Sequence, residues 1–242
     1  MSAQENQENP RRSAAKVVRD RVNRGNARFW KHSDFVGLPP SAVATELSRL
    51  ARSGALQRVA KGVYYHQTAT AFGASMAAGT AVAAQTLSAP VHPAGLSAAN
   101  LLGLSTQNPM RPEYATPAPG LPTALRDAVV HTGRPSQRAN LPMEDGAILE
   151  TLRESARSSD LSPEETASRL LRLLADHERF RRLAIVALTE PPRVRAMLGA
   201  LGEELKMPPP PLNRLRKSLN PLSRFDFGSL SSLRYARDWQ AK

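Results

Sequence analysis

The chain has 242 residues, of which 41% are hydrophobic and only 5% aromatic, so its core must be built mainly from leucine, alanine and valine. Its net charge of +12 favours a polyanionic partner such as nucleic acid, and its lack of cysteine excludes disulfides and thiolate metal sites. The N-terminal MSAQENQENPRRS has no apolar signal core, and the most apolar run, FGASMAAGTAVAAQTL, is too short for a membrane span, so we expect a soluble protein of the reducing cytoplasm.

The basic surplus lies mostly at the two ends of the chain. Residues 1–73 hold 12 basic and 5 acidic side chains, and residues 205–242 hold 8 basic and 2 acidic ones. The stretch 74–140 is nearly balanced, with 4 basic and 2 acidic side chains. A basic N-terminal block is typical of a DNA-binding head, although a run of charge can also be only a solvated face.

The first two predicted elements are helices at the start of a small N-terminal domain, residues 13–68. Residues 1–12 are polar, and we expect them to be disordered. Ser13 is placed to cap a helix through AAKVVRDRVNR, and Gly25 is placed to end it by adopting a positive φ. Ser33 is placed to cap a short second helix, which the following Gly-Leu-Pro-Pro ends.

A third helix and a hairpin complete this predicted domain. Ser41 is placed to cap the helix AVATELSRLARS. The apolar residues that recur on one face of this helix are Val43, Leu47 and Leu50. Between Ala55 and Gln67, two short strands flank a turn at Lys61 and Gly62. Three helices followed by a two-stranded wing is the order of a winged helix-turn-helix.

The polar side of the third helix and the wing carry the residues that we expect to contact DNA. They are Ser41, Thr45, Arg49 and Arg52 on the helix, and Arg58 and Lys61 on the wing. A major groove admits one α-helix, whose exposed side chains reach base edges, while basic residues on a wing neutralise flanking phosphates. The alternative is a winged helix of the same shape that makes protein contacts instead.

The rest of the chain, residues 69–242, is expected to form a larger mixed domain that is mostly helical. Its expected elements are an Ala-rich helix over 69–87, a short helix SAANLLGL capped by Ser97, strands in EYATP and DAVVHTG, and helices in MEDGAILETLRESARS, SPEETASRLLRLLADHERFRRLAIVAL and PPRVRAMLGALGEEL. The strongest capping signal is Ser162, which precedes a proline and two glutamates. Residues 208–211, PPPP, read as a stiff spacer before a last basic helix, LNRLRKSL. The expected fold class is α+β, mostly helical.

Three stretches of the chain resemble the AbiEi-type antitoxins of type IV toxin–antitoxin systems. They are LSRLARSGALQRVAKGVYY, GLSAANLLGLSTQNPMRPEYATP and LNRLRKSLNPLSRFDFGSL, in the family's order. The resemblance implies an N-terminal winged helix that represses its own operon by binding inverted-repeat operator DNA, as monomers that cooperate on DNA. It also implies that residues 69–242 form an antitoxin domain that counters a toxin of the nucleotidyltransferase fold, with or without direct contact. On matching positions it implies the same six DNA-facing residues.

The last basic helix is a second candidate site. Arg214, Arg216 and Lys217 lie on it, with leucines near the opposite face. Three interpretations stay open: the cluster docks on the toxin, it touches DNA beside the operator, or it is only the solvated side of an amphipathic helix.

The chain lacks the patterns of common catalytic and cofactor sites. Its five histidines are scattered, and we expect them at the surface or at caps; no Walker-type, dinucleotide-binding or Gly-x-Ser-x-Gly loop occurs. FGSL, which begins at Phe227, resembles the Gly-Ser of nucleotidyltransferases, but no Asp-x-Asp follows it. We therefore expect no enzyme, metal or cofactor. Two alternatives remain: a stand-alone regulator whose C-terminal domain senses a small molecule, and an enzyme such as a nuclease that its head guides to DNA.

Overall fold

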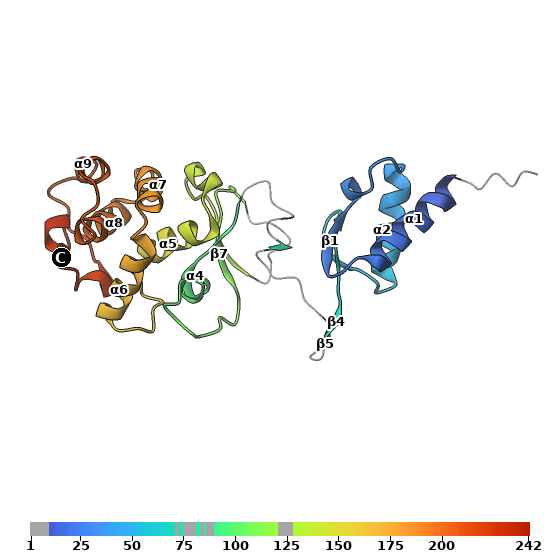
Figure 1. Ribbon diagram of the computed structural model, residues 1–242, viewed down its shortest axis with the longest axis horizontal. Helices are drawn as coiled ribbons and strands as arrows, with labels where there is room; N and C mark the ends of the chain where they lie inside the picture. Colours follow the sequence, from blue (N-terminus) through green and yellow to red (C-terminus); the bar gives the residue numbers. More distant parts are fainter. Residues whose placement is uncertain (1–9, 71–72, 75–80, 83–84, 86–89, 121–127) are drawn as a thin grey trace, which may run out of the picture. The chain divides into compact units, whose positions relative to one another are not determined.

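The computed structural model divides into two compact units, unit 1 (residues 1–87) and unit 2 (residues 88–242), which Figure 1 shows along the chain. It describes residues 10–70, 73–74, 81–82, 85, 90–120 and 128–242. These parts are α+β and rich in helix, as the sequence predicts. Each unit has a hydrophobic core of its own.

Unit 1 combines two helices with a three-stranded antiparallel sheet. Its elements are α1 (Pro10–Arg24), β1 (Arg28–Lys31), the 3-10 helix η1 (His32–Asp34), α2 (Pro40–Arg52), β2 (Gln57–Ala60), β3 (Val63–His66), and the short pair β4 (Ala69–Thr70) and β5 (Gly73–Ala74). The strand order is β1-β3-β2, so β3 lies in the centre. The side chains that form the core are Val18, Val22, Trp30, Phe35, Val43, Leu47, Leu50, Leu56 and Tyr64. Helix α1 packs against α2 beside this sheet.

The structure corrects several local predictions in unit 1. The stretch before the second predicted helix is the strand β1, and that helix is only the three-residue η1. Ser13 and Ser41 do not cap helices, because α1 and α2 begin earlier, at prolines. A proline at the first helical position has φ already set for the helix and has no N–H that would lack a partner there. Of the tail expected to be disordered, residues 10–12 belong to α1, and the rest lie outside the described residues.

Gly25 follows the end of α1, as predicted, but for a different reason. It does not adopt a positive φ. A Cβ at this position would lie 2.8 Å from Cζ2 of Trp30. The absence of a side chain therefore lets the buried indole of β1 pack against the end of the helix.

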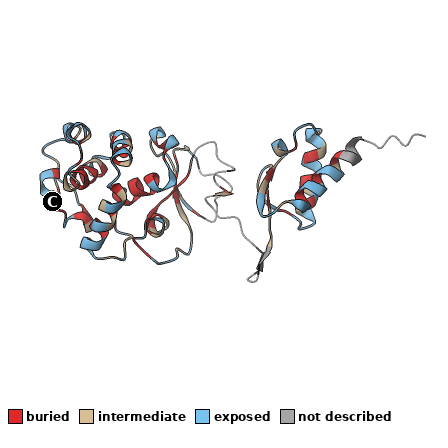
Figure 2. Ribbon diagram, in the orientation of Figure 1, coloured by how far each residue is buried: buried red, intermediate tan, exposed pale blue. Residues whose placement is uncertain are grey.

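Unit 2 is a helical bundle with a small mixed sheet at one side (Figure 1). Its strands are β6 (His92–Pro93), β7 (Glu113–Ala115) and β8 (Val129–His131), with β7 central, antiparallel to β6 and parallel to β8. Its helices are α4 (Gly95–Leu101), the 3-10 helix η3 (Ser136–Asn140), α5 (Met143–Arg153), α6 (Pro163–Leu174), α7 (His177–Ala187), α8 (Pro192–Glu204), α9 (Pro209–Lys217), η4 (Gly228–Leu230) and η5 (Arg237–Trp239). Figure 2 shows that α5 and α8 are the most deeply buried of these helices.

Most of the predicted elements of unit 2 are confirmed, with two changes among the helices. Ser162 caps α6: its Oγ accepts a hydrogen bond from the Glu165 N–H at 3.2 Å, and the Glu165 carboxylate accepts one from the Ser162 N–H at 3.1 Å. The long helix predicted after it is instead two helices, because the Asp176 carboxylate accepts from the Glu178 N–H and begins α7. Ser97 does not cap α4, since its hydroxyl accepts from the Glu113 N–H of β7.

The proline run and the Ala-rich segment also differ from their predictions. The PPPP stretch is not a spacer, because Pro208 is the N-cap of α9 and the next three prolines form its first turn. The first N–H groups of a helix have no partner within the helix, so prolines are tolerated there. The predicted helix over 69–87 is wrong at its start, where β4 pairs with β5. Most of the remainder lies outside the described residues.

A buried ionic network joins η3, α5 and the turn between α7 and α8 in unit 2. The Arg138 side chain is 0% exposed and pairs with Glu150 and, at 2.6 Å, with Glu190. Arg134 donates two hydrogen bonds of 2.8 Å to the Glu150 carboxylate. Burial raises the pKa of Glu150, but the hydrogen bonds from Arg134 and the charge of Arg138 outweigh it and hold the pKa below its usual range. The network thus favours the ionised form of the buried Glu150 carboxylate beside a buried guanidinium.

His92 packs against this network and is not the surface residue that the sequence suggests. It is buried, and its Nε2 lies 3.3 Å from the backbone oxygen of Arg138. Burial lowers the pKa of His92 below its usual value. The neutral imidazole with its proton on Nε2 can donate to that carbonyl.

Candidate nucleic-acid interface

Helix α2 presents one polar face to the surface of unit 1. Its buried face carries Val43, Leu47 and Leu50, which pack into the core as predicted. The residues predicted to face DNA are all exposed, and their spacing places them on the opposite face: Ser41, Thr45, Arg49 and Arg52. The structure therefore brings the four helix residues into one exposed stripe, which we call the α2 stripe.

A buried carboxylate, which sequence reasoning missed, lies beneath this stripe. Glu46 is only 4% exposed, and one of its oxygens accepts from Arg19 Nε at 3.1 Å and from Arg49 Nη2 at 3.0 Å. A buried carboxylate needs such partners, since an isolated one would be costly. The signal in the sequence is that Glu46 has the spacing of the apolar face while basic residues flank it. Arg49 is therefore positioned by Glu46 of α2, which is in turn paired with Arg19 of α1.

The other members of the α2 stripe differ in whether they already have a hydrogen-bond partner. The Arg52 guanidinium lies in the last turn of α2, and none of the described residues pairs with it. The Thr45 hydroxyl donates to the Ser41 backbone oxygen at 2.8 Å, so its lone pairs, and not its proton, face the solvent. Arg52 is thus the least constrained cation of the stripe.

The hairpin of β2 and β3 follows α2 and carries the two remaining predicted residues. Ala60 pairs with Val63, so the turn consists of Lys61 and Gly62, as predicted. Gly62 has a φ of +75°, a conformation that disfavours other residues. Lys61 is exposed at the tip and has no partner in the described part of the chain, whereas Arg58 Nε lies 3.4 Å from the Ala60 oxygen.

The hairpin is fastened to α2 by a short connection. The Leu56 N–H donates to the Leu50 oxygen at 3.1 Å, and both side chains belong to the core of unit 1. The ladder between β2 and β3 is irregular between Arg58 and Ala60, which is the signature of a β-bulge. The position of Lys61 is therefore set by the core rather than by a free loop.

A second basic surface lies on α1 and β1. A hollow of about 400 Å³ is lined there by Val17, Asp20, Arg21, Arg24, Gly25, Arg28 and Trp30. The Arg28 guanidinium lies 4.0 Å from the centre of the Trp30 ring, and Arg21 donates to the Asp34 backbone oxygen. The sequence shows the excess of positive charge in residues 1–73 but does not predict that part of it lies on this surface.

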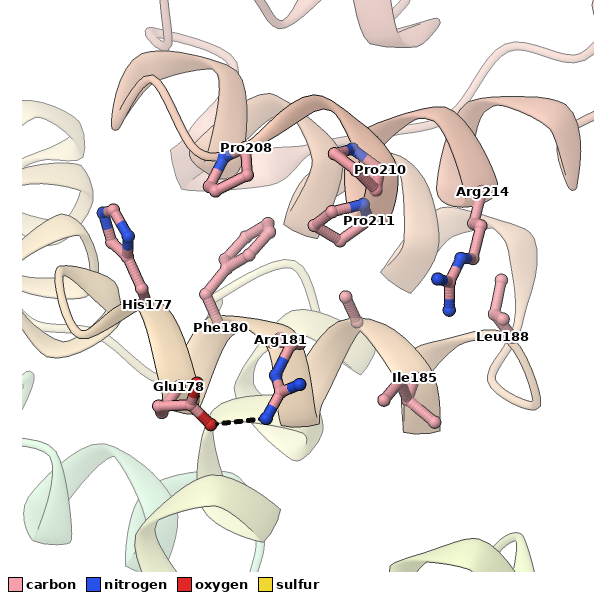
Figure 3. Close-up of a pocket in the computed structure, with 11 residues that line it drawn as sticks. His177, Glu178, Phe180, Arg181, Ile185, Leu188, Pro208, Pro210, Pro211 and Arg214 are labelled. Atoms are coloured by element: carbon pink, nitrogen blue, oxygen red, sulfur yellow. Dashed lines mark hydrogen bonds and ion pairs between the residues drawn. The ribbon is translucent and has the colours of Figure 1, made fainter.

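The structure separates the three cations of the last helix, α9. Arg216 is engaged within unit 2, because it pairs with Glu203 at 2.8 Å and lies 4.6 Å from the centre of the Trp239 ring. Arg214 lines a hollow between α7 and α9, which Figure 3 shows, and Lys217 is exposed. The three cations therefore do not act as one cluster.

The described residues contain no metal site and no membrane-spanning helix. In this part of the chain, no three His, Asp or Glu side chains are grouped so that they could hold a metal ion. Among the helices of that same part of the chain, none is long and apolar enough to cross a membrane.

Comparisons with known proteins describe the fold but name no activity. Residues 17–121 match a family of unknown function, DUF6088, so the match covers less than half of the chain. Among solved structures, the crystal structure of the RV2827C protein from Mycobacterium tuberculosis is similar, with a TM-score of 0.51 and 19% sequence identity over 94% of this chain and 90% of that one. No curated protein matches the chain. At this identity the structural match shows only that the fold occurs in another protein, and the function has to be argued from the surfaces.

Proposed function

We propose that the chain is a double-stranded-DNA-binding protein with an N-terminal winged helix-turn-helix, which represses its own operon. The observation that carries this proposal is the α2 stripe, which is exposed and basic at Arg49 and Arg52 and is followed by a short hairpin with Lys61 at its tip. Helix α1, strand β1, the 3-10 helix η1 in place of the predicted second helix, helix α2 and a two-stranded hairpin follow one another along the chain, and this order supports the proposal.

In this proposal α2 enters the major groove and the hairpin follows the adjacent backbone. Arg49 keeps one N–H on Glu46 while the rest of its guanidinium faces a base, so its orientation is set before DNA binds. Arg52 and Lys61 have no partner among the described residues, and each can neutralise a phosphate without breaking an ion pair. Thr45 accepts a hydrogen bond, since its proton is already donated to Ser41.

We further propose that the chain acts as an antitoxin of the AbiEi type against a nucleotidyltransferase toxin. This part rests on the three stretches that resemble those antitoxins, the last of which begins at Leu212 within α9 and continues past its end. The test expresses a nucleotidyltransferase-type toxin from the same operon, with and without this chain. Restored growth supports the antitoxin role, and continued growth arrest contradicts it.

The DNA-binding proposal is tested with the DNA upstream of the chain's own gene. Fluorescence anisotropy titrations at several salt concentrations compare the full chain with Arg49→Ala, Lys61→Ala and a matched control, Arg172→Ala, whose arginine is exposed on α6 of unit 2. We expect Arg49→Ala to cost about 1–3 kcal/mol of binding and to relax specificity.

Lys61→Ala should mainly reduce the salt slope, by about 1, and the control should change neither quantity. Unchanged affinity and slope in both test variants would contradict the proposal.

A further inference from the structure

A hollow of about 380 Å³ lies between α7 and α9 in unit 2, on elements that the DNA-binding proposal does not use. Figure 3 shows α7 along one side and α9 along the other, with proline rings of α9 opposite Phe180 of α7. Its lining includes Phe180, Ile185 and Leu188 from α7 and its C-cap, prolines at the start of α9, and Arg214. Its volume falls within the range of small-molecule sites, which is roughly 300–1,000 Å³.

The α9 side of this hollow is unusually apolar for the start of a helix. The first N–H groups of a helix normally face water or an anion, because they have no partner within the helix. Here Pro208 and the three prolines of the first turn have no N–H at all. The start of α9 is therefore a hydrocarbon wall, and any polar recognition in the hollow must come from side chains.

The α7 side adds a fixed floor and an uncovered apolar rim. The Phe180 ring is 1% exposed and packs so closely on α8 that a Cβ at Gly202 would lie 2.3 Å from it. Ile185 and Leu188, by contrast, are 54% and 36% exposed. An apolar ligand lying between α7 and α9 would cover the hydrocarbon of Ile185 and Leu188, which water now covers.

The charged side chains at the rim include one arginine that has no acidic partner among the described residues. Glu178 and Arg181 pair with each other at 2.7 Å. The Arg214 guanidinium points into the hollow in Figure 3 and has no partner among the described residues. A single free guanidinium favours one anionic group, whereas the second charge of a dianion would find no further unpaired guanidinium among the described lining residues.

We propose that this hollow binds a small molecule with an apolar body and one carboxylate, such as an aliphatic monocarboxylate. The body lies against the proline wall and Phe180, and the carboxylate accepts hydrogen bonds from Arg214. This site is separate from the α2 stripe and stands whether or not the chain binds DNA.

The test uses isothermal titration calorimetry of the full chain with decanoate, decanol and decylamine, each below the concentration at which it forms micelles or separates from water. The three probes share a chain length and differ in head-group charge. We expect decanoate to bind at least about tenfold more tightly than decanol, and decylamine to bind most weakly. Equal affinities for decanoate and decanol would contradict the proposal, because the guanidinium would then contribute nothing.

Two variants and one control locate the binding. Arg214→Glu should weaken decanoate by at least about tenfold and strengthen decylamine, since the charge at the rim is reversed. Ile185→Ala should weaken all three probes, because it removes exposed hydrocarbon from the rim without changing the core. Arg172→Glu on α6 makes the same charge change away from the hollow and should leave all three affinities unchanged.

Arg214 is exposed, so its substitution does not disturb the core, and circular dichroism checks that each variant stays folded. An equal loss of decanoate binding in Arg214→Glu and Arg172→Glu would indicate general charge attraction and overturn the site. Binding of an acidic amphipathic peptide in the absence of decanoate binding would identify a protein-docking surface instead and would also overturn it.

Discussion

One arginine from each unit shows two opposite uses of this side chain. In unit 1, Arg52 on the α2 stripe is exposed and has no partner among the described residues. In unit 2, Arg138 is fully buried between Glu150 and Glu190. Both residues add one charge to the same total of +12, yet only the first can neutralise a phosphate. Whether a basic residue can bind an anion therefore depends on its own acidic partners more than on the charge of the chain.

The largest effect is expected when the buried ion pair of Arg138 is broken. Glu190→Gln removes the carboxylate that pairs with Arg138 and Arg153 and leaves a buried guanidinium short of a counter-charge. We expect unit 2 to lose about 3–5 kcal/mol of unfolding free energy in urea denaturation followed by circular dichroism. Its control is Glu144→Gln, which breaks an ion pair with the same isosteric change at a half-exposed carboxylate.

That control should cost no more than about 1 kcal/mol. Equal losses in the two variants would mean that burial of the pair does not determine its importance.

A smaller effect is expected at Glu46, a buried carboxylate that pairs with an exposed arginine of the α2 stripe. Glu46→Gln keeps the shape of the side chain but removes the charge that holds Arg19 and Arg49. We expect non-specific DNA to bind up to about tenfold more tightly with a steeper salt dependence, because two guanidinium groups are released. The preference for operator over non-specific DNA should fall.

The measurement is anisotropy with operator and scrambled duplexes at several salt concentrations. A weaker, less salt-dependent interaction with scrambled DNA would show that Glu46 does not restrain these arginines.

The next effect concerns the position of Lys61 rather than its charge. A Cβ at Gly62 meets no atom within 4 Å, but the residue has a φ of +75°, so Gly62→Ala should cost about 1–2 kcal/mol through backbone strain alone. Thermal unfolding of the chain measures this loss. Gly62→Asn is the matched variant, since asparagine tolerates this conformation better and should lose less. Identical losses in the two variants would argue against strain at this turn.

The smallest expected change is a pH dependence of unit 2 that comes from one group. Burial lowers the pKa of His92, so the folded state resists its protonation while the unfolded chain takes up a proton near pH 6.5. Its contribution to stability is therefore complete above about pH 6.5 and is lost as the pH falls below that value. Urea midpoints at pH 7.5 and 5.5 should show the loss, and His92→Gln should reduce the difference between them. A variant with the same difference would exclude His92 as its source.

Local sequence signals predicted the elements that depend on neighbouring residues. The apolar spacing of α2, the turn at Lys61 and Gly62, and the Ser162 cap all follow from residues within a few positions of one another. Because the α2 stripe is the reverse side of that apolar spacing, its four residues could be located from the sequence as well.

The features that the sequence did not reveal depend on distant residues. Strand β1 exists because Arg28–Lys31 pairs with β3 more than thirty residues later. The partner of Glu46 on α1 is 27 positions away, and the burial of His92 depends on η3 and α5. The spacer predicted at residues 208–211 is wrong because proline composition alone does not distinguish a free spacer from the first turn of a helix.

The most direct test of the account is a pair of double charge reversals of equal size. Arg52→Glu with Lys61→Glu alters the proposed DNA surface of unit 1, and Arg172→Glu with Arg237→Glu makes the same change at exposed positions of unit 2. In gel-shift titrations on the upstream DNA, we predict at least about a hundredfold loss of affinity for the first pair and little change for the second. Equal losses in both pairs, or no loss in the first, would contradict the assignment of the α2 stripe and hairpin as the DNA-binding surface.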